Sequence, residues 1–301
     1  MNKRKISVVI TDLDNTLYDW FDVWSQSFDA MLTKLIEQSG VPEKTLIREI
    51  KTIHEKYGTA EYALLIREIP SLQKLHPAED LTKVYAPAIA AYRQKRDECL
   101  RLYPRVLDTL KALKAKGCLI VGYTESQLLY TDYRMRALNL DGLIDYLYSP
   151  ESHALPLNLS PDQVNFYPTN PENLKYTVHR PTPKGAEKPN PKVLLGIITD
   201  IGATKESSIY VGDNRVKDIT MAQEAEVTDV YAAYGDIDKE SKGYQLLRQV
   251  THWKPTSVER EKKEGDVVPT YTLKDSFGEL LDLFDFVPFS GAATNHEIAN
   301  P

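Results

Sequence analysis

The segment Ile6–Leu17, which reads ISVVITDLDNTL, limits the fold of this chain more than any other feature. It opens with a short continuous run of β-branched and apolar residues, which is typical of a strand buried on both faces of a parallel sheet. The run ends at two carboxylates, Asp12 and Asp14, followed by Thr16. Two acids about 4 Å apart repel each other by roughly 4 kcal/mol, so the segment predicts a bound cation, and Mg²⁺ suits oxygen ligands best. The alternative interpretation is a strand that runs into an Asp/Asn turn and a helix cap.

Helical and strand-like segments alternate through the second part of the chain. We predict helices at residues 104–116, 126–138, 193–201, 217–225 and 276–284. We predict further strands at residues 118–123, 143–149, 208–211, 227–234 and 270–273. This alternation indicates an α/β fold with a Rossmann-like, doubly wound parallel sheet.

Residues 20–102 follow a different pattern. Apolar residues recur there every three or four positions, and no alternating strand pattern interrupts them. Helices are predicted from residue 21 to a stop at Gly40, and then at residues 43–57, 60–69 and 81–102. We therefore predict an all-helical domain, residues 20–102, inserted after the first strand. The core domain would comprise residues 1–19 and 103–288.

Two irregular regions and a tail complete the organisation. Residues 150–187 are rich in Pro and Asn but keep several aromatic residues, which favours an ordered flap, with a short hairpin at residues 174–178. Residues 236–269 are polar, with a helix expected near residues 243–250. The tail, residues 289–301, is rich in small and polar residues and is expected to be disordered.

The composition limits the possible partners and the compartment. The chain has 301 residues, with 37 basic and 43 acidic side chains, and its net charge of −6 gives no electrostatic basis for binding nucleic acid or an anionic membrane. No stretch is long enough to span a membrane, and the N-terminal apolar run meets Asp12 too early for a signal peptide. Cys99 and Cys118 are interpreted as reduced core residues. We therefore expect a cytoplasmic protein; no oligomeric state is predicted.

Polar residues gather where the predicted strands end, and ligands bind at that edge of an open α/β sheet. They are Asp12, Asp14, Thr124, Asp213, Asp218 and Lys188, the last within EKPNP. This joint placement predicts a phosphoryl-transfer site. Several of these residues also have a structural alternative: a solvated lysine for Lys188, a helix cap for Thr124, and for Asp218 an acid at a helix N-terminus, where the helix dipole favours it.

Each residue type suits one step of that chemistry. Asp12 is predicted as the nucleophile, which forms an aspartyl-phosphate, and Asp14 as the acid and base. Mg²⁺ would be held by Asp12, the Asp14 carbonyl oxygen and Asp213. Thr124 and Lys188 would hold the phosphoryl oxygens. The remaining two residues, Asp218 and Thr16, are expected to support this site, Asp218 by orienting metal-bound water.

Four segments in this order resemble the haloacid dehalogenase-like superfamily of hydrolases. They are VVITDLDNTL, VGYT, Lys188 within EKPNP, and IYVGDNRVKD. The acid at position 14 resembles the first motif of the phosphatase and phosphomutase branches, because dehalogenases of the family lack this second acid. The resemblance implies a Mg²⁺-dependent phosphatase whose helical insertion is the family's first type of cap domain. Its substrate would be a small phosphorylated metabolite, such as a sugar phosphate or a nucleoside monophosphate.

Three features depart from the family pattern. Glu125 follows Thr124 where many relatives place an Asn, so it is expected to turn away, to bind a substrate hydroxyl or to reach a cation. Residues 150–187 stand where some relatives insert a second type of cap, and residues 236–269 are an elaboration that the pattern does not explain. The alternative functions are a phosphomutase of the same superfamily and a non-catalytic protein that binds a phosphorylated ligand.

Overall fold

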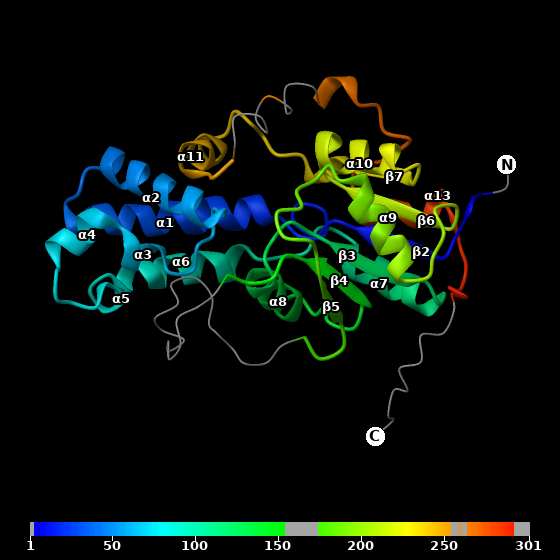
Figure 1. Cartoon of the computed structure of the whole chain (residues 1–301), viewed down its shortest axis with the longest axis horizontal. Helices are drawn as coiled ribbons and strands as arrows, with labels where there is room; N and C mark the ends of the chain where they lie inside the picture. Colours follow the sequence, from blue (N-terminus) through cyan, green and yellow to red (C-terminus); the bar gives the residue numbers. More distant parts are fainter. Residues whose placement is uncertain (1–2, 154–173, 254–258, 260–263, 292–301) are drawn as a thin grey trace.

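The structure of this protein is a computed structural model, which describes residues 3–153, 174–253, 259 and 264–291. Its centre is a seven-stranded sheet in which neighbouring strands pair in parallel. The strand order is β5-β4-β3-β2-β6-β7-β8 (Figure 1). The strands are β2 (Val8–Thr11), β3 (Leu119–Tyr123), β4 (Tyr146–Ser149), β5 (Val178–Pro181), β6 (Ser208–Gly212), β7 (Thr228–Ala232) and β8 (Tyr271–Leu273).

Strand β2 lies in the middle of this sheet, and all four of its residues are buried. Its residue Ile10 is in register with Val121 of β3 on one side and with Tyr210 of β6 on the other. Because both edges are paired and both faces are covered, every position of the strand can be apolar. The preceding residues form β1 (Lys5–Ile6), which pairs with β9 (Asp285–Phe286) in a separate two-stranded parallel sheet.

Helices cover both faces of the seven-stranded sheet. Val9 belongs to a cluster with residues of α7 (Val106–Ala115), α8 (Leu128–Ala137) and α13 (Leu280–Leu283). Val8 and Ile10 belong to a cluster with residues of α9 (Pro191–Asp200) and α10 (Thr220–Glu224). Successive residues of a strand point to opposite faces, which explains this division. The predicted doubly wound, Rossmann-like sheet is confirmed.

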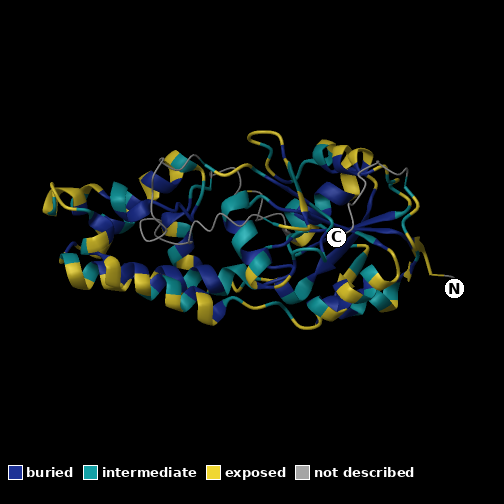
Figure 2. Cartoon of the chain, turned by 90° about the horizontal axis from the view of Figure 1, so that it is seen from below, coloured by how far each residue is buried: buried dark blue, intermediate teal, exposed yellow. Residues whose placement is uncertain are grey.

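The helices between β2 and α7 surround a second apolar core, which includes Trp24, Leu46 and Ile89. They are α1 (Trp20–Ser39), α2 (Glu43–Tyr57), α3 (Leu65–Glu68), α4 (Pro70–Leu75), α5 (Leu81–Val84) and α6 (Ala86–Cys99). We call them together the helical insertion. Figure 1 shows that they extend away from the sheet, and Figure 2 shows exposed residues along their outer surface.

Helix α11 (Lys242–Val250) follows β7 in the chain but packs on the helical insertion. Its residues Leu247 and Val250 are fully buried in the same apolar cluster as Trp24. The imidazole Nδ1 of His54, in α2, lies 2.8 Å from the carbonyl oxygen of Val250. The elaboration at residues 236–269, which the family pattern does not explain, therefore supplies an additional helix to the insertion.

Several predicted elements need correction. The helix predicted at residues 60–69 is limited to α3, and the one predicted at residues 81–102 is divided at Tyr85 into α5 and α6, with Pro87 in the first turn of α6. Residues 217–225 begin as a π-helical turn, η2 (Arg215–Ile219), which continues into α10.

The hairpin predicted at residues 174–178 is wrong. The backbone N–H groups of Lys175, Tyr176 and Thr177 donate to the Asp141 carboxylate at 2.8, 3.1 and 2.8 Å, so they are not available for a hairpin partner. The chain then enters β5, which pairs in parallel with β4. The predictions of a flap and of a disordered tail fall partly on residues 154–173 and 292–301, which lie outside the described residues.

Two smaller predictions concern the cysteines and the membrane. Cys99 and Cys118 are both free and buried, as expected for core residues. Among the helices that the structure describes, none is both long enough and apolar enough to cross a membrane.

Candidate active site

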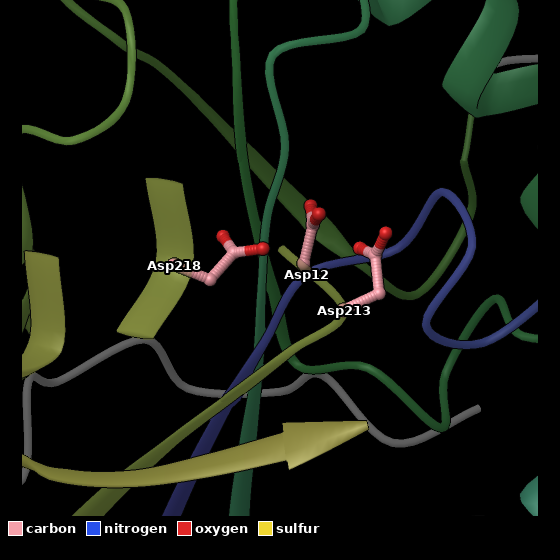
Figure 3. Close-up of side chains that lie close together, drawn as sticks. All are labelled: Asp12, Asp213 and Asp218. Carbon is pink, nitrogen blue, oxygen red and sulfur yellow. The ribbon is translucent and has the colours of Figure 1, made fainter. Parts of the chain in front are cut away.

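Three predicted site residues meet where β2 and β6 end. Asp12 follows β2, and its backbone N–H donates to the Val211 carbonyl oxygen at 2.8 Å. Asp213 follows β6, and Asp218 lies in η2. Each of the three acids offers one carboxylate oxygen within 4.8 Å of those of the other two (Figure 3). A Cβ at Gly212 would lie 2.4 Å from the Asp218 Cγ atom, so the absence of a side chain there leaves room for this carboxylate.

Lys188 is buried among these acids, with 3% of its surface exposed. Its Nζ lies 2.9 Å from the Asp12 Oδ1 and 2.9 Å from the Asp218 Oδ1. It also lies over the aromatic rings of Tyr123 and Tyr210, 4.8 and 5.5 Å from their centroids. Burial by itself would lower the pKa of Lys188, but the charges of the two carboxylates outweigh it and raise that pKa well above its usual value. Lys188 is therefore a charged ammonium, not the solvated lysine of the alternative interpretation.

The acids carry more negative charge than Lys188 compensates. Burial, together with the charges of Asp218 and Asp14, raises the pKa of Asp12 to about 7 although Lys188 lowers it. Burial and the charges of Asp218 and Asp12 raise the pKa of Asp213 well above its usual value. An excess of buried carboxylate oxygens is the donor set that a hard divalent cation prefers. The described residues therefore fit Mg²⁺.

The ligand set differs in one respect from the predicted one. The carboxylate of Asp218, for which an outer position was predicted, lies within the same group as Asp12 and Asp213. The carboxylate of Asp14 is not part of this group. The contribution predicted for Asp14 is its main-chain carbonyl oxygen, and that stays a prediction.

Asp14 is held by donors from the segment after β3 and from α8. Its Oδ2 accepts from the Ser126 hydroxyl at 2.5 Å and from the Thr124 hydroxyl at 3.5 Å. Its Oδ1 accepts from Nη1 of Arg134 at 3.2 Å. The turn between Asp14 and α1 is tight: Asn15 has a φ of +56°, and its N–H donates to the Tyr18 carbonyl oxygen at 2.8 Å. An Asn tolerates this left-handed conformation better than most residues.

The two threonines of the predicted site are both buried. The Thr16 hydroxyl donates to the Asp213 Oδ1 at 3.2 Å, so Thr16 does contact one of the site carboxylates. The Thr124 hydroxyl accepts from the backbone N–H of Ser126 at 3.0 Å. Thr124 does not cap α8, because that helix begins at Leu128 and the preceding residue is Gln127. The phosphate-binding role of Thr124 stays a prediction.

Glu125, the residue that departs from the family pattern, reaches a cation. Its Oε2 lies 2.6 Å from the Lys217 Nζ, and its Oε1 accepts from the backbone N–H of Lys188 at 2.8 Å. Burial would raise the pKa of Glu125, but the charges of Lys217 and Lys188 outweigh it and lower that pKa. Of the three expectations for Glu125, the structure therefore supports an ion pair with a lysine.

A cavity of about 1260 Å³ lies over these residues. Asp12 and Asp14 line it from the core, and Trp20 lines it from the first turn of α1. The rest of its wall includes residues 55–61 of the helical insertion, residues 124–127, residues 150–153, residues 181–189 and residues 252–253 after α11. A cavity of this size accommodates a small organic ligand.

Sequence reasoning missed Ser126, Arg134 and Glu61. Ser126 stands two residues after Thr124, and its polar side chain beyond a strand end was the available signal. No sequence signal distinguished Arg134 or Glu61, because Arg134 is one of two arginines in α8 and Glu61 is one of many acids in the insertion. The two side chains form an ion pair although 73 residues separate them in sequence.

Comparisons with known proteins agree with this geometry. The family model of haloacid dehalogenase-like hydrolases matches residues 6–226, which is more than half of the chain. A glyceraldehyde 3-phosphate phosphatase from Methanopyrus kandleri is 24% identical over 231 residues, which cover 75% of this chain and 83% of that protein.

Two solved structures resemble the fold. A 2-haloacid dehalogenase from Pseudomonas syringae has a TM-score of 0.50 at 17% identity, over 83% of this chain and 100% of that one. A protein assigned as a β-phosphoglucomutase from Thermotoga maritima has a TM-score of 0.50 at 17% identity, over 92% of this chain and 97% of that one. The fold, the order of the motifs and the extent of the family match lead to one conclusion: the chain belongs to the haloacid dehalogenase-like hydrolases, a family of enzymes.

Proposed function

We propose that this chain is a Mg²⁺-dependent phosphohydrolase that acts on a small phosphorylated metabolite through an aspartyl-phosphate. One observation carries the proposal. The carboxylate of Asp12 lines the cavity, lies 2.9 Å from the buried Lys188 ammonium and is grouped with the carboxylates of Asp213 and Asp218. A nucleophile, a cation and a set of oxygen ligands at one point are what phosphoryl transfer to an aspartate requires.

The metal would be held by Asp12, Asp213 and the main-chain carbonyl oxygen of Asp14, with Asp218 next to them. When bound, Mg²⁺ offsets the repulsion between the carboxylates and the phosphate and draws charge from the phosphoryl oxygens. The raised pKa values of Asp12 and Asp213 support this assignment, because burial first and neighbouring carboxylates second disfavour the ionised acids, which a bound cation would favour.

In the first half-reaction, a carboxylate oxygen of Asp12 attacks phosphorus. The bond between phosphorus and the ester oxygen breaks, and that oxygen leaves with the proton that Asp14 donates. The phosphoryl group is then bound covalently to Asp12. The Lys188 ammonium and the Thr124 hydroxyl orient the phosphoryl oxygens and stabilise their charge in the transition state.

In the second half-reaction, water attacks the phosphorus of the aspartyl-phosphate. Asp14 takes a proton from this water, the bond between phosphorus and the Asp12 oxygen breaks, and inorganic phosphate leaves. Asp12 returns as a carboxylate and Asp14 as an acid. The helical insertion acts as a cap that excludes other water from the cavity while this occurs.

Two observations, the cavity and one relative, support the proposed substrate class. The cavity of about 1260 Å³ has room for the organic part of a sugar phosphate or a nucleoside monophosphate. A relative with 24% identity is a phosphatase of glyceraldehyde 3-phosphate, which is a phosphorylated triose. We therefore place sugar phosphates first among the candidate substrates.

The test is phosphate release from a panel of sugar phosphates and nucleoside monophosphates, with Mg²⁺ and with EDTA. We expect release that depends on Mg²⁺ and that Asp12→Asn reduces by at least about 10⁴-fold, because an amide cannot act as the nucleophile. The variant should unfold at nearly the wild-type temperature, since the two side chains have the same shape.

Two results would contradict the proposal. Near-normal turnover in Asp12→Asn would exclude this residue as the nucleophile. Conversion of one phosphate isomer into another without release of inorganic phosphate would instead show a phosphomutase.

A further inference from the structure

Arg134 is the most deeply buried cation near Asp14. It lies in α8, and 1% of its side chain is exposed. Its Nη1 contacts the Asp14 Oδ1 at 3.2 Å, and its Nη2 is paired with the Oε1 of Glu61. A buried guanidinium is costly unless carboxylates compensate its charge, and here one carboxylate comes from the core and the other from the helical insertion.

Two tryptophan indoles hold the loop that carries Glu61. The Trp20 Nε1 donates to the Glu61 Oε2 at 3.2 Å, and the Trp24 Nε1 donates to the carbonyl oxygen of Ala60 at 3.0 Å. Both tryptophans belong to α1, so the loop is fixed to the longest helix of the insertion among those that the structure describes. The Glu61 carboxylate can therefore contact Arg134 only when this part of the insertion is packed against the core.

The contacts on Asp14 fix the orientation of its carboxylate. Arg134 occupies one oxygen, and Ser126 occupies the other at 2.5 Å. Donors on both oxygens restrict rotation of the carboxylate about its Cβ–Cγ bond. A guanidinium can hold two carboxylates with separate nitrogens in one plane, which the point charge of a lysine cannot do.

Arg134 is placed to act through Asp14 and not on the substrate itself. Asp14 and Glu61 both line the cavity, whereas Arg134 is not among the described residues that do. Its Nη1 contacts Asp14 and the Ser126 hydroxyl, and its Nη2 contacts Glu61. A residue in this position can change where the acid points without touching a phosphate.

We propose that Arg134 and Glu61 form a positioning pair, which aims the Asp14 carboxylate at the leaving oxygen and makes that aim depend on the seating of the helical insertion. The inference rests on the proposed function, in which Asp14 donates the proton to that oxygen. Misalignment by about 1 Å can slow such a step by about 10²-fold.

The chemistry supplies a discriminating test. A sugar alkoxide is strongly basic and leaves only with a proton, whereas 4-nitrophenolate is weakly basic and leaves without one. The ratio kcat/KM covers the steps up to departure of the leaving group and not the later hydrolysis of the aspartyl-phosphate, which is the same for both esters. A fault in the aim of Asp14 therefore lowers kcat/KM for a sugar phosphate much more than kcat/KM for 4-nitrophenyl phosphate. A fault in phosphate binding or in folding slows both.

We expect Arg134→Lys to lower kcat/KM for the best sugar phosphate of the panel by about 10²-fold, and Glu61→Gln by about tenfold. Both variants should keep KM for the sugar phosphate, and both should change kcat/KM for 4-nitrophenyl phosphate by less than about threefold. The matched control is Arg136→Lys, in the same helix, because the Arg136 guanidinium is paired with Asp132 at 2.6 Å rather than with Asp14. This control variant should hydrolyse both esters at wild-type rates.

A double-mutant cycle tests whether the pair acts through Asp14. In an Asp14→Asn background, Glu61→Gln should cause no further loss with the sugar phosphate, because the residue that it positions is already disabled. Full additive losses would overturn the proposal, as would equal losses for the two esters in Arg134→Lys.

A crystal structure of Arg134→Lys gives a readout that does not depend on activity. We expect the Asp14 carboxylate to be rotated or in more than one conformation; an unchanged, fully ordered Asp14 would overturn the proposal. If the wild-type protein hydrolysed neither ester, the proposed function would fail, and this crystal structure would still decide the positioning role.

Discussion

Lys188 and Arg134 are both buried cations, and each contacts two carboxylates. Lys188 joins Asp12 to Asp218, and all three residues belong to the core at the end of the sheet. Arg134 joins Asp14 to Glu61, and the latter belongs to the helical insertion. The first group is thus internal to the core, whereas the second connects the core to the insertion.

Under the proposed function, this difference separates two tasks, one for Asp12 and one for Asp14. The Lys188 group, which consists of Lys188, Asp12 and Asp218, would gather charge around the nucleophile, and its geometry is set by strands that pair within one sheet. The Arg134 group, which consists of Arg134, Asp14 and Glu61, would orient the acid, and its geometry is complete only when two parts of the molecule are in contact. We expect changes in the first group to affect every substrate and changes in the second group to affect selected ones.

The largest expected effect distinguishes the two cations directly. Lys188→Arg should lower kcat/KM by about 10²–10³-fold, because a planar guanidinium does not fit where one Nζ contacts two carboxylates at 2.9 Å. The loss should be equal for 4-nitrophenyl phosphate and for a sugar phosphate, unlike that in Arg134→Lys. The matched control is Lys205→Arg, because Lys205 forms a partly exposed ion pair with Glu226. This variant should keep the wild-type kcat/KM for both esters. A loss confined to the sugar phosphate would show that the two cations do not differ in task.

A fall in pH should destabilise the helical insertion, which contributes Glu61 to the Arg134 group. Burial lowers the pKa of His54 to about 4, although its contact with the Val250 carbonyl opposes this shift. Below pH about 6.5 the unfolded chain binds a proton at this histidine, and the folded protein does not until pH about 4. The free energy of unfolding should therefore fall by up to about 3 kcal/mol as the pH falls from 7 to 4.

Denaturant unfolding of wild type and His54→Asn across this range measures the effect. An Asn can still donate to the Val250 carbonyl oxygen but cannot take up the proton. The variant should lose the part of the pH dependence that comes from His54. Identical pH dependence in the two proteins would show that His54 is not the titrating group.

Mg²⁺ should stabilise the Lys188 group and leave the Arg134 group unaffected. At 100 times its dissociation constant, a ligand of the folded state adds about 2.7 kcal/mol to the free energy of unfolding. We expect a rise of the unfolding temperature with Mg²⁺ that EDTA reverses and that Asp213→Asn removes. Glu61→Gln should keep the full rise. Loss of the rise in Glu61→Gln would show that the two groups are coupled through the metal.

The smallest effect concerns Glu125, which connects Lys217 to the backbone of Lys188. About a third of each side chain in the pair is exposed, so solvent screens the interaction. Glu125→Gln should lower the free energy of unfolding by about 1 kcal/mol or less and slow both esters by less than about tenfold. A larger loss of activity that is specific to one ester would indicate that Glu125 contacts the substrate.

The sequence allowed the Lys188 group to be predicted because strand ends fix its members. Asp12 and Asp213 follow continuous apolar strands, and parallel strands end at one edge of a sheet. Strand β5 escaped prediction because its sequence, VHRP, lacks an apolar run; it is an edge strand with partly exposed residues. The sequence pattern therefore identified the buried central strands and missed this edge strand, whereas the opposite edge strand, β8, was predicted at residues 270–273.

The Arg134 group was not predictable for a different reason. Helical periodicity identifies which face of α2 is buried but not which helix covers it, so neither α11 nor the loop around Glu61 could be placed. The predicted helix at residues 60–69 even assigned Glu61 to a regular element, whereas α3 begins at Leu65. Contacts between distant segments depend on tertiary packing, which local patterns do not encode.

The contact of α11 with the helical insertion also has a consequence for how the protein is made. His54 and the Val250 carbonyl are separated by 196 residues, so the apolar face of the insertion stays uncovered until most of the chain has been synthesised. Non-local contacts of this kind slow folding, and exposed apolar surface favours aggregation. We therefore expect that residues 20–102 expressed alone would be poorly soluble, and that nascent chains ending before residue 250 would be sensitive to proteases.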